Sequence, residues 1–155
     1  MIDLKRILLP TDFSKYSQAA LDYAAAFAEK FGAELHLLHV VQNLAVFIPD
    51  MVNVMPPVGP SPEQMATAVK AAFDRLIQEQ KLEKFKPVAV SREGTPFYEI
   101  IQYAKEKDID LIVMGTHGHS GLAHVLMGSV TEKVVRKSPC PVLTVRHPEH
   151  EFVHP

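Results

Sequence analysis

The sequence LIVMGTHGHSGLAHVLMGS, from Leu111 to Ser129, decides the fold class. Its first four residues form a continuous apolar run that is typical of a buried strand. Its last residue opens a second pattern, because Ser129 and Glu132 have the spacing of a capping box at the start of a helix. A buried strand, a loop with glycines and a helix in this order indicate an α/β protein.

The same alternation continues on both sides of this stretch. Four further apolar runs are predicted strands, at Arg6–Pro10, Glu34–Val41, Val88–Val90 and Pro141–Arg146. Predicted helices run from Ser17 to Phe31, from Pro62 to about Lys81, from Pro96 to about Lys107 and from Ser129 to Lys137. The strands are continuous apolar runs rather than alternating ones, so we expect an open parallel sheet with helices on both faces. The 155 residues suit one domain over residues 1–147, with a flexible tail at 148–155.

Composition argues against several classes of partner. The formal charge is −2, with 16 basic residues against 18 acidic ones, so no strong field would attract nucleic acid or anionic lipid. No apolar run approaches the roughly 18 residues that a membrane span needs. Cys140 is the single cysteine, which excludes an intramolecular disulfide, and its setting favours a structural role over a reactive thiol. We expect a cytoplasmic protein that binds neither nucleic acid nor a membrane.

The loop after the strand Leu111–Met114 carries a candidate phosphate site. In open α/β sheets, ligands bind beyond the carboxyl ends of the strands, where the strand order reverses. Three glycines would let backbone N–H groups approach an anion, and the next helix would point its positive end there. These glycines are Gly115, Gly118 and Gly128. Side-chain donors occur in the same stretch, namely His117, His119 and Ser129.

Each of these features also has a plain structural interpretation. A single glycine could only shape a turn, Asp12 could be a turn or helix-capping residue, and Val40 could be core. Metal binding by His117, His119 and His124 is disfavoured because no carboxylate or thiol lies close in sequence to complete a site. The sequence has neither a P-loop nor the dinucleotide fingerprint, which disfavours motor-type NTPases and dehydrogenases.

The full spacing Gly-x2-Gly-x9-Gly-Ser is the nucleotide signature of the ATP-binding universal stress proteins. The sequence resembles it at Gly115, Gly118, Gly128 and Ser129. The similarity extends to three other segments, Leu9–Asp12, Leu38–Val40 and Pro139–Val145. The resemblance implies a Rossmann-like five-stranded parallel sheet of order 3-2-1-4-5, with the nucleotide across the ends of strands one and four. Residues 43–60 look idiosyncratic: this apolar, proline-rich loop could pack on the domain, cover the base or contact a partner.

The resemblance also implies which residues bind the nucleotide. Asp12 would accept hydrogen bonds from the ribose, Val40 would pair with adenine through its backbone, and Gly115 would pass beside the sugar. The phosphates would be held by Gly118, His119, Gly128, Ser129, Val130 and Thr131. The other candidate binding residues are Pro10, Thr11, Met114 and His117. The implied cofactor is ATP, or AMP or ADP in its place, with Mg²⁺ or Mn²⁺ accompanying the triphosphate.

The function predicted on this basis is that of a nucleotide-dependent regulatory or stress-response module. The resemblance suggests a homodimer through the edge strand 141–146. A regulatory module would also act on a protein partner, which the sequence does not identify. One alternative is a slow ATPase or phosphoryl-transfer enzyme, and another is an interaction module that binds no nucleotide. Adenylyl transfer is disfavoured, because His117–His119 differs in spacing and position from the His-x-Gly-His motif of nucleotidyltransferases.

Overall fold

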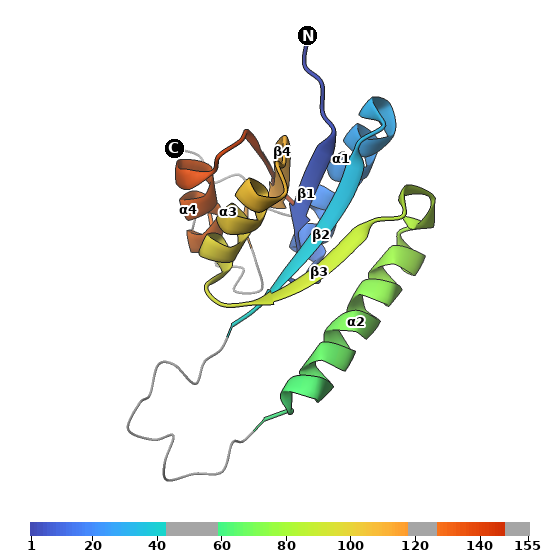
Figure 1. Cartoon of the computed structure of the whole chain (residues 1–155), viewed down its shortest axis with the longest axis vertical. Coiled ribbons are helices and arrows are strands. Elements are labelled where there is room, and N and C mark those ends of the chain that lie inside the picture. Colours follow the sequence, from blue (N-terminus) through green and yellow to red (C-terminus); the bar gives the residue numbers. More distant parts are fainter. Residues whose placement is uncertain (43–58, 118–126, 148–155) are drawn as a thin grey trace.

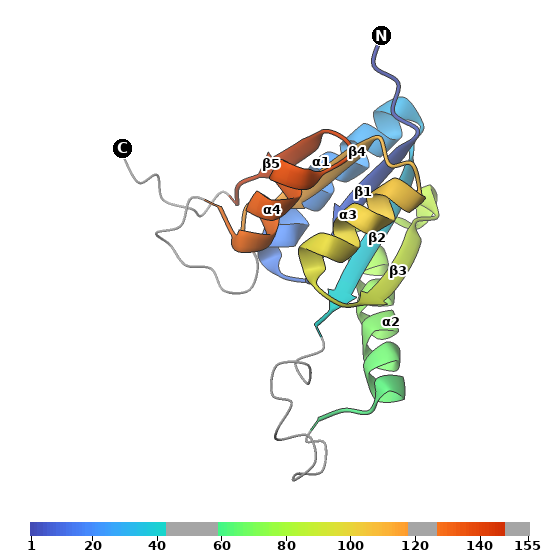
Figure 2. The same ribbon diagram turned by 60° about the vertical axis from the view of Figure 1, so that its left-hand side comes forward.

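The computed structural model describes residues 1–42, 59–117 and 127–147, and its centre is a parallel sheet of five strands. The strands are β1 (Arg6–Pro10), β2 (Glu34–Val41), β3 (Val88–Glu93), β4 (Leu111–Gly115) and β5 (Val142–Val145). Their order across the sheet is β3-β2-β1-β4-β5, with all four pairings parallel; Figure 1 labels β1 to β4, and Figure 2 labels all five strands. The predicted strand order 3-2-1-4-5 is therefore confirmed, and the order reverses between β1 and β4.

The sheet is covered by helices on both faces, as predicted. The helices are α1 (Lys15–Phe31), α2 (Pro62–Glu79), α3 (Pro96–Glu106) and α4 (Ser129–Lys137), with a short 3-10 turn, η2, at Glu83–Phe85. Buried side chains of α1 and α2 form one core cluster, and those of α3 and α4 form the other. Figure 2 shows α3 and α4 in front of the sheet and α1 behind it.

Both faces of the central strand are buried, which explains its continuous apolar sequence. In β1, Ile7 and Leu9 contact the α1–α2 cluster, whereas Leu8 contacts the α3–α4 cluster. All three side chains are at most 1% exposed. Successive strand residues point to opposite faces, so a strand between two helical layers needs apolar residues at every position.

Local signals set most of the element boundaries. The side chain of Ser14 accepts a hydrogen bond from the N–H of Ser17, so α1 begins at Lys15, earlier than predicted. Gly32 ends α1 in the left-handed conformation, with φ of 65°. At α2, Ser61 and Gln64 form the predicted capping box.

A predicted helix cap and a predicted strand end were wrong. Ser129 is not the cap of α4, because Gly128 takes the N-cap position and Ser129 is the first helical residue. Strand β3 continues to Glu93, three residues beyond its apolar core, because the longer neighbour β2 pairs with it as far as Val41.

Some sequence features named above lie outside the described residues, namely most of the loop 43–60, Gly118, His119, His124 and the tail at 148–155. Within the described residues, no helix is both long and apolar enough to cross a membrane.

Candidate functional site

A cavity of about 630 Å³ lies at the carboxyl ends of β1, β2 and β4. Eleven of the thirteen candidate residues line it, and the other two, Gly118 and His119, lie outside the described residues. The eleven are Pro10, Thr11, Asp12, Val40, Met114, Gly115, His117, Gly128, Ser129, Val130 and Thr131. The fold thus brings together segments that are about a hundred residues apart, at the place where ligands bind in open α/β sheets.

The turn between β1 and α1 is fixed by its own side chains. The Thr11 hydroxyl oxygen accepts from the N–H of Phe13 at 3.0 Å, and Asp12 Oδ1 accepts from the N–H of Ser14 at 3.0 Å. Ser17 donates its hydroxyl to Ser14 O at 2.9 Å, so in the 3.0 Å contact between Thr11 and Ser17 the donor is Thr11. Asp12 therefore has the turn role that its position suggests, and that bond also orients its carboxylate at the cavity wall.

Gly115 permits a closer backbone approach than Gly128, the other described glycine of the site. A Cβ atom on Gly115 would lie 2.8 Å from the carbonyl oxygen of Tyr16 and 3.2 Å from its carbonyl carbon. Both are backbone atoms in the first turn of α1, so a side chain could not be accommodated by a change of rotamer. A glycine at the end of β4 is therefore needed to bring β4 and α1 together beside the cavity.

The first turn of α4 is tied to the end of β4. The N–H of Gly128 donates to Thr116 O at 2.7 Å, and the buried hydroxyl of Thr131 donates to Gly115 O at 2.9 Å. The hydroxyl proton of Thr131 is therefore already used within the protein. What Thr131 can offer to a phosphate is its backbone N–H.

The start of α4 presents backbone donors that no capping side chain among the described residues satisfies. The first hydrogen bond within the helix runs from Glu132 N to Gly128 O, so the N–H groups of Ser129, Val130 and Thr131 precede the ladder. Gly128 occupies the N-cap position and has no side chain with which to accept from them. All three residues line the cavity, and the positive end of the helix dipole points the same way. This arrangement is suited to an anion.

The lining that the structure describes contains few charged groups. Asp12 is its one carboxylate, His39 and His117 are its imidazoles, and it has no Lys or Arg. His117 is buried, and its Nδ1 lies 3.0 Å from the hydroxyl of Thr116. Positive potential for an anion therefore comes mainly from backbone N–H groups rather than from cationic side chains.

Eight lining residues were not predicted as site residues. They are Ser17, Leu38, His39, Val41, Gln42, Met65, Pro96 and Ile100. Those at the end of β2 could have been found, because the carboxyl end of every strand near the switch point is a place to search. Met65 could not, since it lies on α2 and only the packing of that helix brings it to the cavity.

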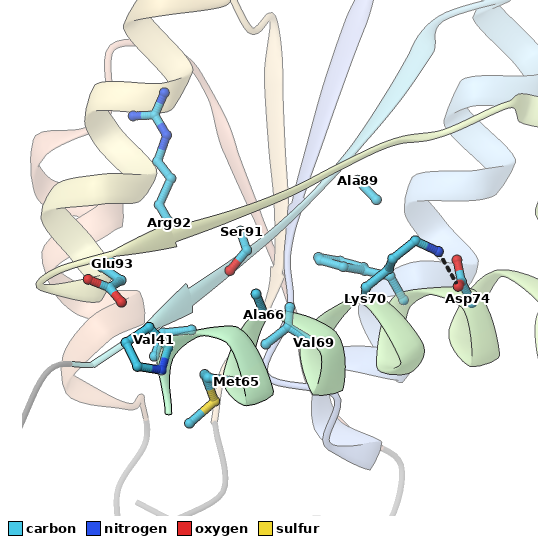
Figure 3. Close-up of a pocket in the computed structure, with 12 residues that line it drawn as sticks. Val41, Met65, Ala66, Val69, Lys70, Asp74, Ala89, Ser91, Arg92 and Glu93 are labelled. Carbon is cyan, nitrogen blue, oxygen red and sulfur yellow. Dashed lines mark hydrogen bonds and ion pairs between the residues drawn. The ribbon is translucent and has the colours of Figure 1, made fainter. Parts of the chain in front are cut away.

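A second hollow, of about 480 Å³, lies between α2 and the edge strand β3 (Figure 3). It shares Val41 and Met65 with the cavity, but none of the candidate residues lines it. Apolar side chains such as Val69 form much of its wall, and Lys70 pairs with Asp74 at 2.7 Å along α2. This groove has no uncapped helix start, because α2 begins with its capping box. The cavity is therefore the candidate functional site.

Three titratable groups elsewhere have structural roles. Burial raises the pKa of the Cys140 thiol, which keeps it protonated and unreactive. Burial also lowers the pKa of His36 and raises that of Tyr103, and Nδ1 of His36 lies 2.7 Å from the hydroxyl of Tyr103. Within the described residues, no group of three or more His, Cys, Asp or Glu side chains could hold a metal ion.

Comparisons with known proteins agree with this architecture. The model of the universal stress protein family matches residues 3–146. Universal stress protein MJ0531 of Methanocaldococcus jannaschii is 36% identical over 156 residues, covering 95% of this chain and 85% of that protein. The solved structure of the hypothetical protein MJ0577 of the same organism has a TM-score of 0.74 at 31% identity, covering 96% of this chain and 99% of that one.

Two solved structures with bound nucleotides share the fold at lower identity. One is a universal stress protein in complex with cAMP, with a TM-score of 0.61 and 23% identity over 93% of this chain and 98% of that one. The other is the universal stress protein from Archaeoglobus fulgidus in complex with dAMP, with a TM-score of 0.59 and 20% identity over the same shares. Because the family match spans nearly the whole chain and the relative from Methanocaldococcus jannaschii is similar over most of its length, this chain belongs to the universal stress protein family.

Proposed function

We propose that this chain is an ATP-binding universal stress protein, in which the nucleotide occupies the cavity and acts as a regulatory ligand. The observation that carries this proposal is the start of α4. The backbone N–H groups of Ser129, Val130 and Thr131 lie uncapped on the cavity wall, and Gly128 adds no side chain that could obstruct a phosphate. The cavity volume of about 630 Å³ is within the range of small-molecule sites.

The roles of the remaining residues follow from their places on the wall. Asp12, whose carboxylate is oriented by Ser14, is suited to accept hydrogen bonds from ribose hydroxyls. Val40, at the end of β2, would face the base, and Gly115 would lie beside the sugar. Related folds that hold cAMP and dAMP support an adenine nucleotide as the ligand class.

A divalent cation would accompany the triphosphate. The described lining has no Lys or Arg, so a triphosphate that carries its own Mg²⁺ or Mn²⁺ fits the site better than a free tetra-anion. The cation would then be held mainly by phosphate oxygens, because the one carboxylate of the described lining is Asp12.

Isothermal titration tests the proposal most directly. Wild-type protein would be titrated with ATP, AMP, cAMP, adenosine and inorganic tripolyphosphate, each with and without Mg²⁺. We expect ATP with Mg²⁺ to bind at least tenfold more tightly than adenosine, because adenosine lacks the groups that α4 would hold. Equal binding of ATP and adenosine would show that α4 does not hold phosphate. No binding of any adenine compound would exclude the nucleotide site.

Strand β5 supports a further proposal, that of a homodimer. β5 is an edge strand, and Val142, Leu143 and Thr144 are only half-buried, which leaves its outer backbone groups without a partner strand in the described sheet. A second copy would cover this edge. Analytical ultracentrifugation would show a dimer for the wild type and a shift toward monomer for Leu143→Lys. A monomeric wild type would exclude this arrangement.

A further inference from the structure

The hydrogen-bond ladder between β1 and β2 ends in an unusual way. Its last registered pair is Pro10 with Leu38, and the N–H of Thr11 then donates to Leu38 O at 2.8 Å. In a parallel ladder, the next bond would run from the N–H of Val40 to the carbonyl oxygen of Thr11. That carbonyl instead accepts from the ring of His39, whose Nδ1 lies 2.8 Å away.

The protonation of this ring nitrogen follows from its partner. A carbonyl oxygen can only accept, so Nδ1 of His39 carries the hydrogen in this contact. The ring also contacts Phe13, at 4.7 Å between ring centroids, and Phe13 in turn contacts Phe73 of α2 edge to face at 5.1 Å. His39 is thus positioned by packing to donate to Thr11.

The consequence concerns the backbone of Val40. Along β2, the carbonyl of Leu38 faces β1, whereas that of Val41 accepts from Gly94 on the β3 side. Successive peptide groups of a strand alternate in this way, so the N–H and C=O of Val40 face the β1 side. β1 has already ended there, and Val40 lines the cavity.

We propose that His39 is a positioning residue that ends the β1–β2 ladder one bond early. The Val40 N–H and C=O are thereby left to form hydrogen bonds with the edge of the base. This inference rests on the proposed nucleotide site. A neighbouring donor and acceptor on one residue match adenine, whose N1 accepts and whose 6-amino group donates. Hypoxanthine presents the opposite pattern, with N1–H donating and O6 accepting. A site that pairs with one pattern rejects the other, because its buried polar groups would be left unpaired.

The first test compares ATP with ITP, which differ only at this edge. Titrations would use wild type, His39→Leu and His39→Asn, because the Asn amide can keep a donor near the position of Nδ1. We expect wild type to bind ATP about tenfold or more tightly than ITP, which corresponds to the binding free energy of one or two hydrogen bonds. His39→Leu should reduce that ratio to about one by weakening ATP alone, since Val40 N–H can then close the ladder onto Thr11. His39→Asn should keep most of the preference.

Three outcomes of the titrations would overturn the inference. They are a wild type that binds ATP and ITP equally, a His39→Leu variant that keeps the wild-type ratio, and a variant that weakens both nucleotides equally. The last outcome would mean that His39 contacts the ligand directly or merely supports the fold. Thermal unfolding of each variant would separate a loss of folded protein from a loss of base selectivity.

The second test needs no nucleotide. Amide hydrogen exchange followed by NMR would compare Val40 with Leu38, whose N–H lies within the ladder. In wild type we expect Val40 to exchange at least tenfold faster than Leu38, and in His39→Leu we expect the two rates to converge. Equal protection in wild type would overturn the inference. If Val40 exchanges as expected but wild type binds no nucleotide, the proposed function fails, and the role of His39 is limited to shaping the end of the sheet.

Discussion

The starts of α2 and α4 show two ways in which a helix treats its first N–H groups. At α2, Ser61 accepts from Gln64 N at 3.2 Å and Gln64 Oε1 accepts from Ser61 N at 2.8 Å. At α4, Gly128 can accept nothing through a side chain, and the first N–H groups lie on the cavity wall. The same backbone donors are satisfied locally in one helix and left for a ligand in the other. The difference lies in the residue at the N-cap and in what the helix start faces.

The largest effect is expected when α4 is given a charged cap. Gly128 has φ of −65° and ψ of 153°, which an aspartate at an N-cap readily adopts. In Gly128→Asp the carboxylate would accept from the first N–H groups of α4 and repel phosphate. We expect ATP affinity to fall by about a hundredfold or more, measured by isothermal titration.

Gly128→Ala is the matched control for this variant. It adds the same Cβ atom, 3.2 Å from Thr116 O, without an acceptor. Its loss of affinity should be much smaller than that of Gly128→Asp. Equal losses in the two variants would mean that the added atom, and not the cap, excludes the nucleotide.

Gly115→Ala tests the close approach between the end of β4 and the start of α1. Its Cβ would lie 2.8 Å from Tyr16 O, so the end of β4 and the start of α1 must separate. We expect the free energy of unfolding to fall by about 1–3 kcal/mol, the usual cost of overpacking. ATP affinity should fall as well. Urea denaturation measures the first effect, and an unchanged midpoint would show that the backbone relaxes freely. Gly32→Ala is not a suitable control, because Gly32 is left-handed.

Thr131→Val separates a structural hydroxyl from a phosphate contact. The hydroxyl of Thr131 donates to Gly115 O, and its loss leaves a buried carbonyl without that partner. We expect a loss of stability of about 1–2 kcal/mol. The backbone N–H at position 131 remains, so the ATP affinity of the folded variant should change by less than about threefold. This change corresponds to less binding free energy than one ordinary hydrogen bond contributes. A tenfold loss of affinity at unchanged stability would instead assign the hydroxyl to the phosphate.

The smallest effect is expected at the other helix start. Ser61→Ala removes the capping side chain of α2 and should reduce stability by about 1 kcal/mol. ATP affinity should not change, because Ser61 lines neither the cavity nor the groove within the described residues. Parallel urea and titration measurements on Ser61→Ala and Gly128→Asp would show whether the two starts have distinct roles. A loss of ATP binding in Ser61→Ala would remove that distinction.

The sequence was sufficient for features that depend on local pattern. The apolar run of β1 was predicted with its correct limits, Arg6–Pro10, and the capping box of α2 was identified from four residues. The continuous apolar strands predicted a parallel sheet, and the family resemblance supplied its strand order. In each case the deciding residues are neighbours in the chain, or belong to a pattern repeated in every strand.

The sequence was insufficient where a distant partner decides. Ser129 looked like a cap, but the bond from Gly128 N to Thr116 O places the cap one residue earlier. Thr131 was predicted to hold phosphate, but the sequence did not show that its hydroxyl donates to Gly115 O, which leaves the backbone N–H for that role. His39 was not predicted as a site residue, since its bond to Thr11 joins β2 to the end of β1, about thirty residues earlier. Short-range patterns do not record such long-range hydrogen bonds.

The placement of β1 between β2 and β4 has a consequence for how the chain folds. β1 pairs with β2, which follows it after a short crossover. Its other neighbour, β4, is about a hundred residues away in the chain, as in the pairing of Ile7 with Leu111. Contacts between such distant residues slow folding. The two halves of the cavity belong to these early and late segments of the chain. During synthesis, the cavity can therefore form only after α4 has emerged, and a nucleotide can stabilise only the nearly complete protein.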